Sequence, residues 1–187
     1  PTGVLLYLKT GLGNSALEGM PALMGELLTW RRELQSRHRH DAFAVAVPTM
    51  NLGHIHGGDS PNRICGECEL HIDLRPTPGL DLDILRAELY RRVADLAGQR
   101  GLDWRVDRLF PGIQALETPA GSAIVTAAEA LTGHSAGAVA FATEAPFFDR
   151  LGMETLILGP GDIAQAHQPD EYLDLARIPP TIEILRA

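Results

Sequence analysis

The sequence offers little that would cross-link the protein or carry it into a membrane. Two of its 187 residues are cysteines, and no apolar run approaches the roughly 20 residues that span a bilayer. The N-terminus also lacks the basic segment, apolar segment and cleavage site that mark a secreted chain. We therefore expect neither export nor membrane insertion, and we predict a cytoplasmic protein.

Basic residues are in deficit as well. Lysine and arginine number 16 against 24 aspartates and glutamates, which gives a formal net charge of -8 and a pI near 5.3. Clustered Lys and Arg drive most binding to nucleic acid, so we expect no nucleic-acid partner. What the sequence does contain is 45% hydrophobic residues in 20.2 kDa, enough for one large domain or two small ones.

The two cysteines, Cys65 and Cys68, have the spacing of a redox or zinc CxxC motif. They lie in Ile64–Arg75, where apolar and polar residues alternate as in a strand with one buried face. Strand residues three apart point to opposite faces, so the two thiols should not easily bind one metal or form a disulfide. We interpret them as reduced, packed residues of a cytosolic protein, with a redox pair as the alternative.

Residues 1–109 alternate between strand and helix patterns. Ser15, with Glu18 three residues later, predicts the start of a first helix, and a second is expected from Asp81 to Gly98. Extended segments are expected at Val4–Lys9, Phe43–Val47, Asn51–His56, Ile64–Arg75 and Trp104–Leu109. This order predicts an α/β fold of the split β-α-β (ferredoxin-like) type, with both helices on one face of an antiparallel sheet.

Residues 110–187 resemble the end of an α/β domain. We expect a helix that is capped by Thr118-Pro119 and runs to Leu131, a helical turn at Pro146 and a terminal helix from Pro180. Residues 138–141 and 155–158 are apolar and are predicted to be strands, the second of them buried. This part is too small to be a complete domain of that class.

A polar loop follows the expected strand 155–158 and carries His167 close to Asp170 and Glu171. Enzymes of the α/β class place ligands and catalytic groups at the ends of buried strands, which makes His167 a candidate functional residue. A surface histidine in a polar turn is the alternative. His54 and His56 share a strand face and could form another metal site. With no third ligand evident nearby, we interpret both as structural.

Three segments together resemble a known family. Residues 48–65, 142–147 and 158–172 are similar, in the right order, to the di-zinc amidohydrolases that include aminoacylases, carboxypeptidases and desuccinylases. They look most like the bacterial acetylornithine deacetylases within that family. The resemblance implies a two-domain α/β protein. Residues 1–109 would form a dimerisation (lid) domain, together with a short N-terminal remnant of a zinc-peptidase-like catalytic domain. Residues 110–187 would form the C-terminal part of the catalytic domain.

The resemblance also implies metal chemistry and a homodimer. Two Zn²⁺ ions per complete active site, or Co²⁺ in their place, would bind the water that attacks the acetamide, and His167 matches a metal ligand. The reaction would release ornithine and acetate from N-acetyl-L-ornithine, a step of arginine biosynthesis. Rival interpretations are a related N-acyl amino acid hydrolase, such as a desuccinylase or an aminoacylase, and a non-catalytic dimerisation module.

Four residues match substrate-binding positions of the family. Asn62 could equally be a turn former after Pro61. The guanidinium group of Arg75 would bind the substrate carboxylate, but it could equally pair with Asp73. Thr143 and Glu144 precede an expected helix start. Our hypothesis is that Glu144 pairs with the side-chain ammonium of ornithine.

The departures from the family are equally informative. The sequence has no His-x-Asp metal pair, no bridging aspartate in a glycine-rich turn and no Glu-Glu pair, so no catalytic residue is assigned. It opens with Pro1-Thr2, where relatives have a ligand glutamate before Pro-Thr, and Leu12–Ser15 replaces a longer histidine-containing loop. A fragment is one explanation. We favour the other, a longer protein with segments missing here, because Val4 follows Pro1-Thr2 without room for a connecting strand.

Overall fold

The computed structural model describes residues 2–11 and 13–187, so Pro1 and Leu12 of the two motifs above lie outside the described residues. The chain forms two compact units. The first, which we call the sheet unit, comprises Pro1–Ala115 with Val139–Ala142, and the second, the C-terminal unit, comprises Leu116–Ala138 with Thr143–Ala187. Across the described parts of both units, no helix is long and apolar enough to cross a bilayer.

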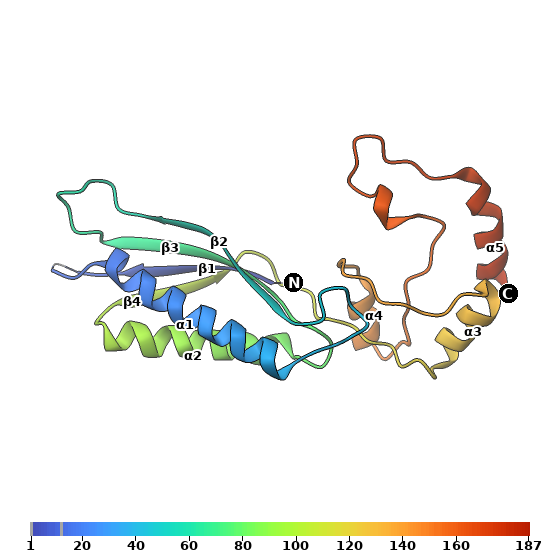
Figure 1. The fold of residues 1–187 in the computed structure, drawn as a ribbon, viewed down its shortest axis with the longest axis horizontal. Helices are drawn as coiled ribbons and strands as arrows, with labels where there is room; N and C mark the ends of the chain where they lie inside the picture. Colours follow the sequence, from blue (N-terminus) through green and yellow to red (C-terminus); the bar gives the residue numbers. More distant parts are fainter. Residues whose placement is uncertain (1, 12) are drawn as a thin grey trace. The chain divides into compact units, whose positions relative to one another are not determined.

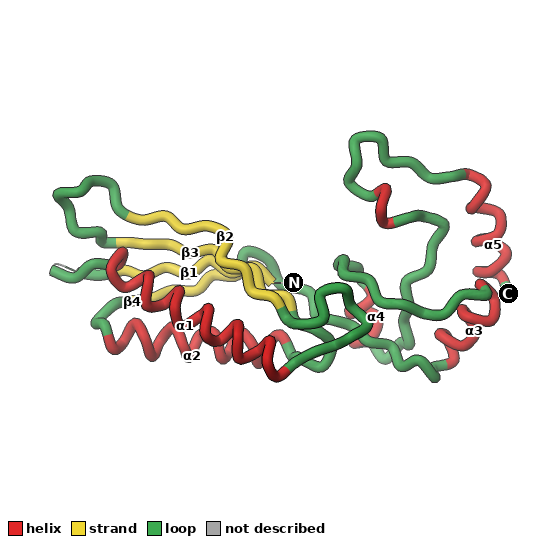
Figure 2. The backbone as a smooth tube through the Cα atoms, in the orientation of Figure 1, coloured by secondary structure: helices red, strands yellow, loops and turns green. Residues whose placement is uncertain are grey.

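The sheet unit contains four strands and two helices in the order that the sequence predicts. The strands are β1 (Thr2–Lys9), β2 (Thr49–Gly57), β3 (Glu67–Arg75) and β4 (Asp103–Arg108), and the helices are α1 (Ala16–Arg37) and α2 (Leu82–Gln99). The strands lie in the order β2-β3-β1-β4, and every neighbouring pair is antiparallel. Both helices lie on one side of this sheet (Figures 1 and 2). The predicted fold class is confirmed.

The core lies between the sheet and the two helices. Strands β1 and β3 bury alternate residues, as the sequence pattern predicts for Cys68, Leu70, Ile72 and Leu74. The helices contribute buried residues at helical spacing, chiefly Met20, Leu23, Leu27, Trp30, Leu85, Leu89 and Val93. The opposite face of the sheet has no such cover from α1 or α2, and it carries the polar side chains described below.

Both helices begin at their predicted caps. The Ser15 hydroxyl accepts a hydrogen bond from the backbone N–H of Glu18 at 3.3 Å, and the Asp81 carboxylate accepts from the N–H groups of Asp83 and Ile84. These contacts satisfy amide groups that the first helical turn leaves without partners.

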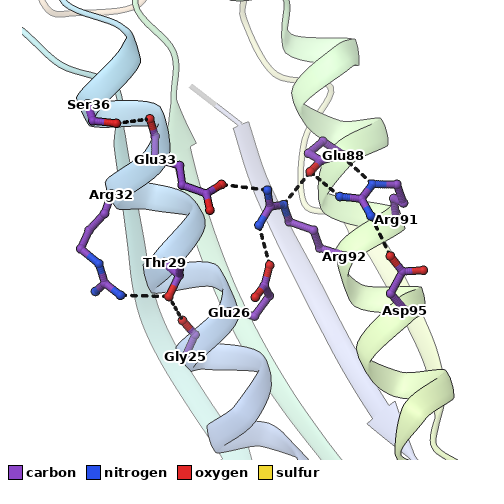
Figure 3. A network of polar contacts seen from close by, with 10 residues as sticks. All are labelled: Gly25, Glu26, Thr29, Arg32, Glu33, Ser36, Glu88, Arg91, Arg92 and Asp95. Atoms are coloured by element: carbon purple, nitrogen blue, oxygen red, sulfur yellow. Dashed lines mark hydrogen bonds and ion pairs between the residues drawn. The ribbon is translucent and has the colours of Figure 1, made fainter.

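A network of ion pairs joins α1 to α2 (Figure 3). The Arg92 guanidinium contacts Glu26 and Glu33 of α1 at 2.5 and 2.9 Å and Glu88 of α2 at 2.6 Å. Hydrogen bonds from Arg91, and further ones from Arg92, lower the pKa of Glu88 to about 2. Arg92 also lies 5.4 Å from the centre of the Trp30 ring, so its charge is held against the core by both helices.

The C-terminal unit is built from short helices and long irregular segments. Its helices are α3 (Ala123–Thr132), α4 (Ala145–Arg150) and α5 (Ile178–Arg186), with 3-10 turns η1 (Ile163–Gln165) and η2 (Leu175–Arg177). The loops between them appear green in Figure 2. Helix α3 ends at Thr132, one residue beyond the predicted Leu131, with Gly133 as its cap. It begins after Ser122, because residues 119–122 form a turn closed by Ser122 N–H to Pro119 C=O.

Three predicted strands are wrong. Phe43–Val47 forms turns and bends ahead of β2, and residues 138–141 and 155–158 are irregular. The segment 155–158, expected to be buried, is partly or fully exposed. A strand needs a neighbour to hydrogen-bond, and none of the three segments pairs with another described segment.

Candidate substrate and metal site

Arg75 is the last residue of β3 and belongs to the uncovered face of the sheet. It lines an open hollow of about 400 Å³ with Asn51, His71, Asp73 and Phe110. Its Nε donates to Asp73 at 2.7 Å, which is the ion pair that the sequence left as an alternative. This contact uses Nε, and the two terminal nitrogens of Arg75 donate to no other described residue. Because the Arg75 side chain is 62% exposed, these nitrogens can bind the carboxylate of a ligand.

Asn62 lies in the exposed loop between β2 and β3. Its Oδ1 accepts a hydrogen bond from the Ser60 hydroxyl, and the N–H of Arg63 donates to the carbonyl of Ser60 at 3.2 Å. Both contacts belong to a turn, the alternative role that the sequence left open. The amide nitrogen of Asn62 makes no described contact within the sheet unit.

Asn62 and Arg75 lie at opposite ends of β3. The loop that holds Asn62 precedes Glu67, whereas Arg75 ends the strand. The strand has nine residues, so its ends are eight steps of about 3.3 Å, or roughly 26 Å, apart. This length far exceeds that of an N-acetylated amino acid, so one copy of the chain does not bring both side chains to one small substrate.

Thr143 and Glu144 directly precede α4 in the C-terminal unit. The Thr143 hydroxyl accepts a hydrogen bond from the N–H of Ala145 at 3.2 Å, and Pro146 occupies the first turn of the helix as predicted. Glu144 is exposed and does not cap the helix with its carboxylate. Its side chain is therefore available to a cation from solvent.

His167 lies in an exposed loop after η1, with a backbone φ of +63°. Non-glycine residues seldom adopt this left-handed conformation, and it often marks functional positions. The Glu171 carboxylate accepts a hydrogen bond from the backbone N–H of His167 at 3.2 Å, so this side chain closes the loop and His167 itself stays exposed. Among the described residues, His167 does not gather with two further ligand-type side chains.

A different group of potential ligands does come together on the sheet. His54 of β2 lies beside His71 and Glu69 of β3, with all three ligand atoms within 4.8 Å of one another. The interpretation of His54 as a residue without nearby ligands is therefore wrong. The third ligand escaped sequence analysis because the register of β2 against β3 decides which residues meet, and a short alternating pattern does not fix that register.

The two cysteines are both buried free thiols. Cys68 packs under the sheet as predicted, and burial, helped by the nearby Cys65 and Glu69, raises the pKa of its thiol to about 11. Cys65 was expected to point to the face opposite Cys68, but β3 starts only at Glu67, so strand alternation does not apply to Cys65. A thiol with so high a pKa is a poor nucleophile at neutral pH.

Comparison with known proteins defines the class to which this arrangement belongs. Residues 9–101, which cover most of the sheet unit, match the peptidase dimerisation domain family. This segment belongs to that family.

Two curated relatives are more specific. The chain is 48% identical over 173 residues to an acetylornithine deacetylase of Edwardsiella ictaluri, covering 92% of this chain and 45% of the relative. It is 44% identical over 175 residues to an acetylornithine deacetylase of Erwinia tasmaniensis, covering 94% of this chain and 45% of the relative. The chain thus spans slightly less than half the length of these curated relatives, and its predicted resemblance is confirmed.

Solved structures support the fold over nearly the whole chain. An aminopeptidase from Bacillus cereus matches with a TM-score of 0.61 at 16% identity, covering 98% of this chain and 50% of the other. A dinuclear metal-binding peptidase from Bacillus subtilis matches with a TM-score of 0.61 at 13% identity, covering 98% and 47%. At these identities the likeness concerns the fold alone.

Proposed function

We propose that the chain is part of a metal-dependent amidohydrolase that removes the acetyl group from N-acetyl-L-ornithine in arginine biosynthesis. The observation that carries this proposal is the 48% identity to a protein named acetylornithine deacetylase over 92% of the chain. The products would be ornithine and acetate, and the enzyme would work in the cytoplasm.

Within this proposal, residues 1–109 form the dimerisation part and residues 110–187 belong to the catalytic domain. The second assignment is supported by the weak core of the C-terminal unit. Its described buried residues are Ser122, Val125, Ala145 and Pro146, while large apolar side chains such as Phe148, Leu151 and Leu175 are exposed. Apolar surface of this extent normally packs against further protein, here the remainder of a catalytic domain.

The positions of Asn62 and Arg75 support a homodimer, if both residues bind the same substrate. Because the length of β3 separates them, both could contact one substrate only if Asn62 came from one copy of the chain and Arg75 from another. A pair of copies related by twofold symmetry would then form two equivalent sites.

Each of the candidate residues has a role that its chemistry fits. Arg75 would hold the α-carboxylate of the substrate with its free terminal nitrogens, and Asp73 would fix the guanidinium through Nε. Asn62 would donate its amide to the substrate. Thr143, whose hydroxyl also caps the start of α4, would contact the substrate, and the exposed Glu144 would bind the ornithine ammonium.

The fold family implies two metal ions, zinc or cobalt, which would supply an activated water and polarise the acetamide carbonyl. From this chain, His167 fits one ligand, because an exposed imidazole suits Zn²⁺ and the Glu171 carboxylate holds the loop that carries it. The remaining ligands and the general base would come from outside the described residues.

The test uses the native protein purified from the cells that make it. Its intact mass should be roughly twice 20.2 kDa, and it should release acetate from N-acetyl-L-ornithine faster than from succinylated or neutral acetylated amino acids. A chelator should abolish this activity, and zinc or cobalt should restore it. A mass of 20.2 kDa without any hydrolysis would instead favour the non-catalytic dimerisation module.

Two variants of that protein test the residue roles. Arg75→Lys should raise KM for N-acetyl-L-ornithine about tenfold or more, because lysine cannot form the bidentate contact. Arg105→Lys is the matched control, since Arg105 forms the same kind of strand ion pair with Asp107, at 2.9 Å. Glu144→Gln should reduce the preference for acetylornithine over acetylated neutral amino acids, and an unchanged preference would refute its role.

A further inference from the structure

We propose that His54, Glu69 and His71 form a binding site for a divalent transition metal, with zinc as the preferred ion. The site lies on the uncovered face of the sheet, between β2 and β3. It is contained in residues of the sheet unit, so it does not depend on the proposed hydrolysis or on His167.

The pairing of the two strands assembles the site. His54 lies opposite His71, and the next position of the same face pairs His56 with Glu69. The register shifts between Leu52 and His54, so that Gly53 is an extra residue in β2. This bulge keeps Leu52 on the helix side while placing His54 on the open side beside His71.

The distances suit an ion better than they suit direct hydrogen bonds. Nε2 of His54 and Nε2 of His71 lie 3.5 and 3.6 Å from the same oxygen, Oε1 of Glu69. Charge-assisted hydrogen bonds between such groups are shorter, at about 2.7–2.9 Å. Zinc bonds of about 2.0–2.2 Å at tetrahedral angles place neighbouring ligand atoms about 3.3–3.6 Å apart.

The two imidazoles already face each other at the spacing that a shared ion requires. Their ring centres are 4.6 Å apart, with the ring planes at 64°. One nitrogen of each ring lies within 4.8 Å of the other, and binding of an ion would require the more exposed His54 ring to turn towards His71. The exposed fractions of 52% for His54, 36% for His71 and 27% for Glu69 leave the site open to ions from solvent.

The donor set selects the class of metal. Two imidazole nitrogens and one carboxylate oxygen suit Zn²⁺, Co²⁺, Ni²⁺ or Cu²⁺, whereas Ca²⁺ and Mg²⁺ prefer oxygen ligands throughout. Three protein ligands on an open surface leave the fourth position to water.

Nearby positive charges are neutralised by their own partners. On the β1 side, Tyr7 lies opposite Glu69 and carries the guanidinium of Arg105 at 4.3 Å from its ring centre. Arg105 is paired with Asp107 at 2.9 Å. Lys9, further along β1, is paired with Glu67 at 3.1 Å. The carboxylate of Glu69 therefore remains available to a cation bound between the histidines.

The test is a calorimetric titration of the metal-free 187-residue chain with ZnCl₂. We expect one zinc ion per chain at this site, and His54→Ala, His71→Ala and Glu69→Gln should each weaken its binding at least about tenfold, since even outer-shell changes cost 10–100-fold. His56→Ala is the matched control, because His56 is an exposed histidine of the same strand and face outside the cluster. Titration with MgCl₂ should give no binding to this site.

A second measurement separates this site from other histidines and from misfolding. Co²⁺ added to the chain should give visible absorption bands of a four- or five-coordinate ion, and these should persist in His167→Ala but vanish in His54→Gln and His71→Gln. Circular dichroism of each variant should match the unsubstituted chain, because the side chains are at the surface. Equal zinc affinity in the unsubstituted chain and the His54 and His71 variants would overturn the proposal, and so would an equal loss with His56→Ala.

Discussion

Gly112 shows how the absence of a side chain makes room for a buried charge. It has a φ of +83°, and a Cβ on it would lie 2.4 Å from Nη2 of Arg86 and 3.0 Å from the Thr2 hydroxyl. Arg86 is 5% exposed, and its guanidinium donates to Thr2, to Asp83 and to the carbonyl of Pro111. The close approach of this backbone thus brings a carbonyl acceptor to the terminal nitrogens of a cation next to the core, whose Nε has no hydrogen-bond partner among the described residues.

Replacing Gly112 with alanine should lower the free energy of unfolding by about 2 kcal/mol, because the left-handed backbone and the displaced guanidinium both cost stability. Urea denaturation followed by circular dichroism measures this. Gly66→Ala is the control, since a Cβ there meets no atom within 4 Å and its backbone is not left-handed. Equal losses in the two variants would show that Gly112 has no special role.

At the scale of elements, Arg92 links helices α1 and α2. Its side chain is 16% exposed and contacts three carboxylates, of Glu26, Glu33 and Glu88. Removing the cation leaves Glu26 and Glu33 without their positive partner, while Glu88 keeps only its contacts with Arg91.

Arg92→Met should therefore destabilise the sheet unit by about 2 kcal/mol, a value between those of exposed and fully buried ion pairs. Thermal unfolding at pH 7 measures the loss. In Arg32→Met, which removes an exposed hydrogen bond to Thr29, we expect a change below about 0.5 kcal/mol. Lowering the pH from 4.5 towards 2 should reduce the difference in free energy of unfolding between Arg92→Met and the unsubstituted chain. Glu88 then becomes protonated, and the stability that its depressed pKa contributes above this range is lost.

The elements also show what a sequence can and cannot predict. The helices from Ser15 and Asp81 were predictable because capping residues and apolar spacing act locally. Segments such as Phe43–Val47 and 155–158 have strand-like composition but lack a pairing partner, which local pattern does not reveal. The cluster of His54, Glu69 and His71 depends on a register and a bulge, and these are properties of two strands together.

At the scale of the whole molecule, the two units differ in how they are stabilised. The sheet unit has a continuous core between its sheet and its helices. Strands β1, β2 and β3 contribute buried residues to this core, and Val106 of β4 packs against it. The C-terminal unit has few buried residues and many exposed apolar ones. In the proposed enzyme, the sheet unit would be the self-sufficient part, and the C-terminal unit would gain its stability from further catalytic-domain contacts.

The placement of Asn62 and Arg75 at opposite ends of β3 allows genetic complementation in the proposed dimer. If each site takes Asn62 from one subunit and Arg75 from the other, subunits with Asn62→Ala and subunits with Arg75→Ala are each inactive as homodimers. A mixed dimer then has one site with both defects and one site with neither. Random reassembly of equal amounts should restore about a quarter of full activity, since half of the dimers are mixed and half of their sites are intact. Two inactive proteins would thus repair each other without any change to their sequences, and failure to recover activity on mixing would show that each site is built from a single chain.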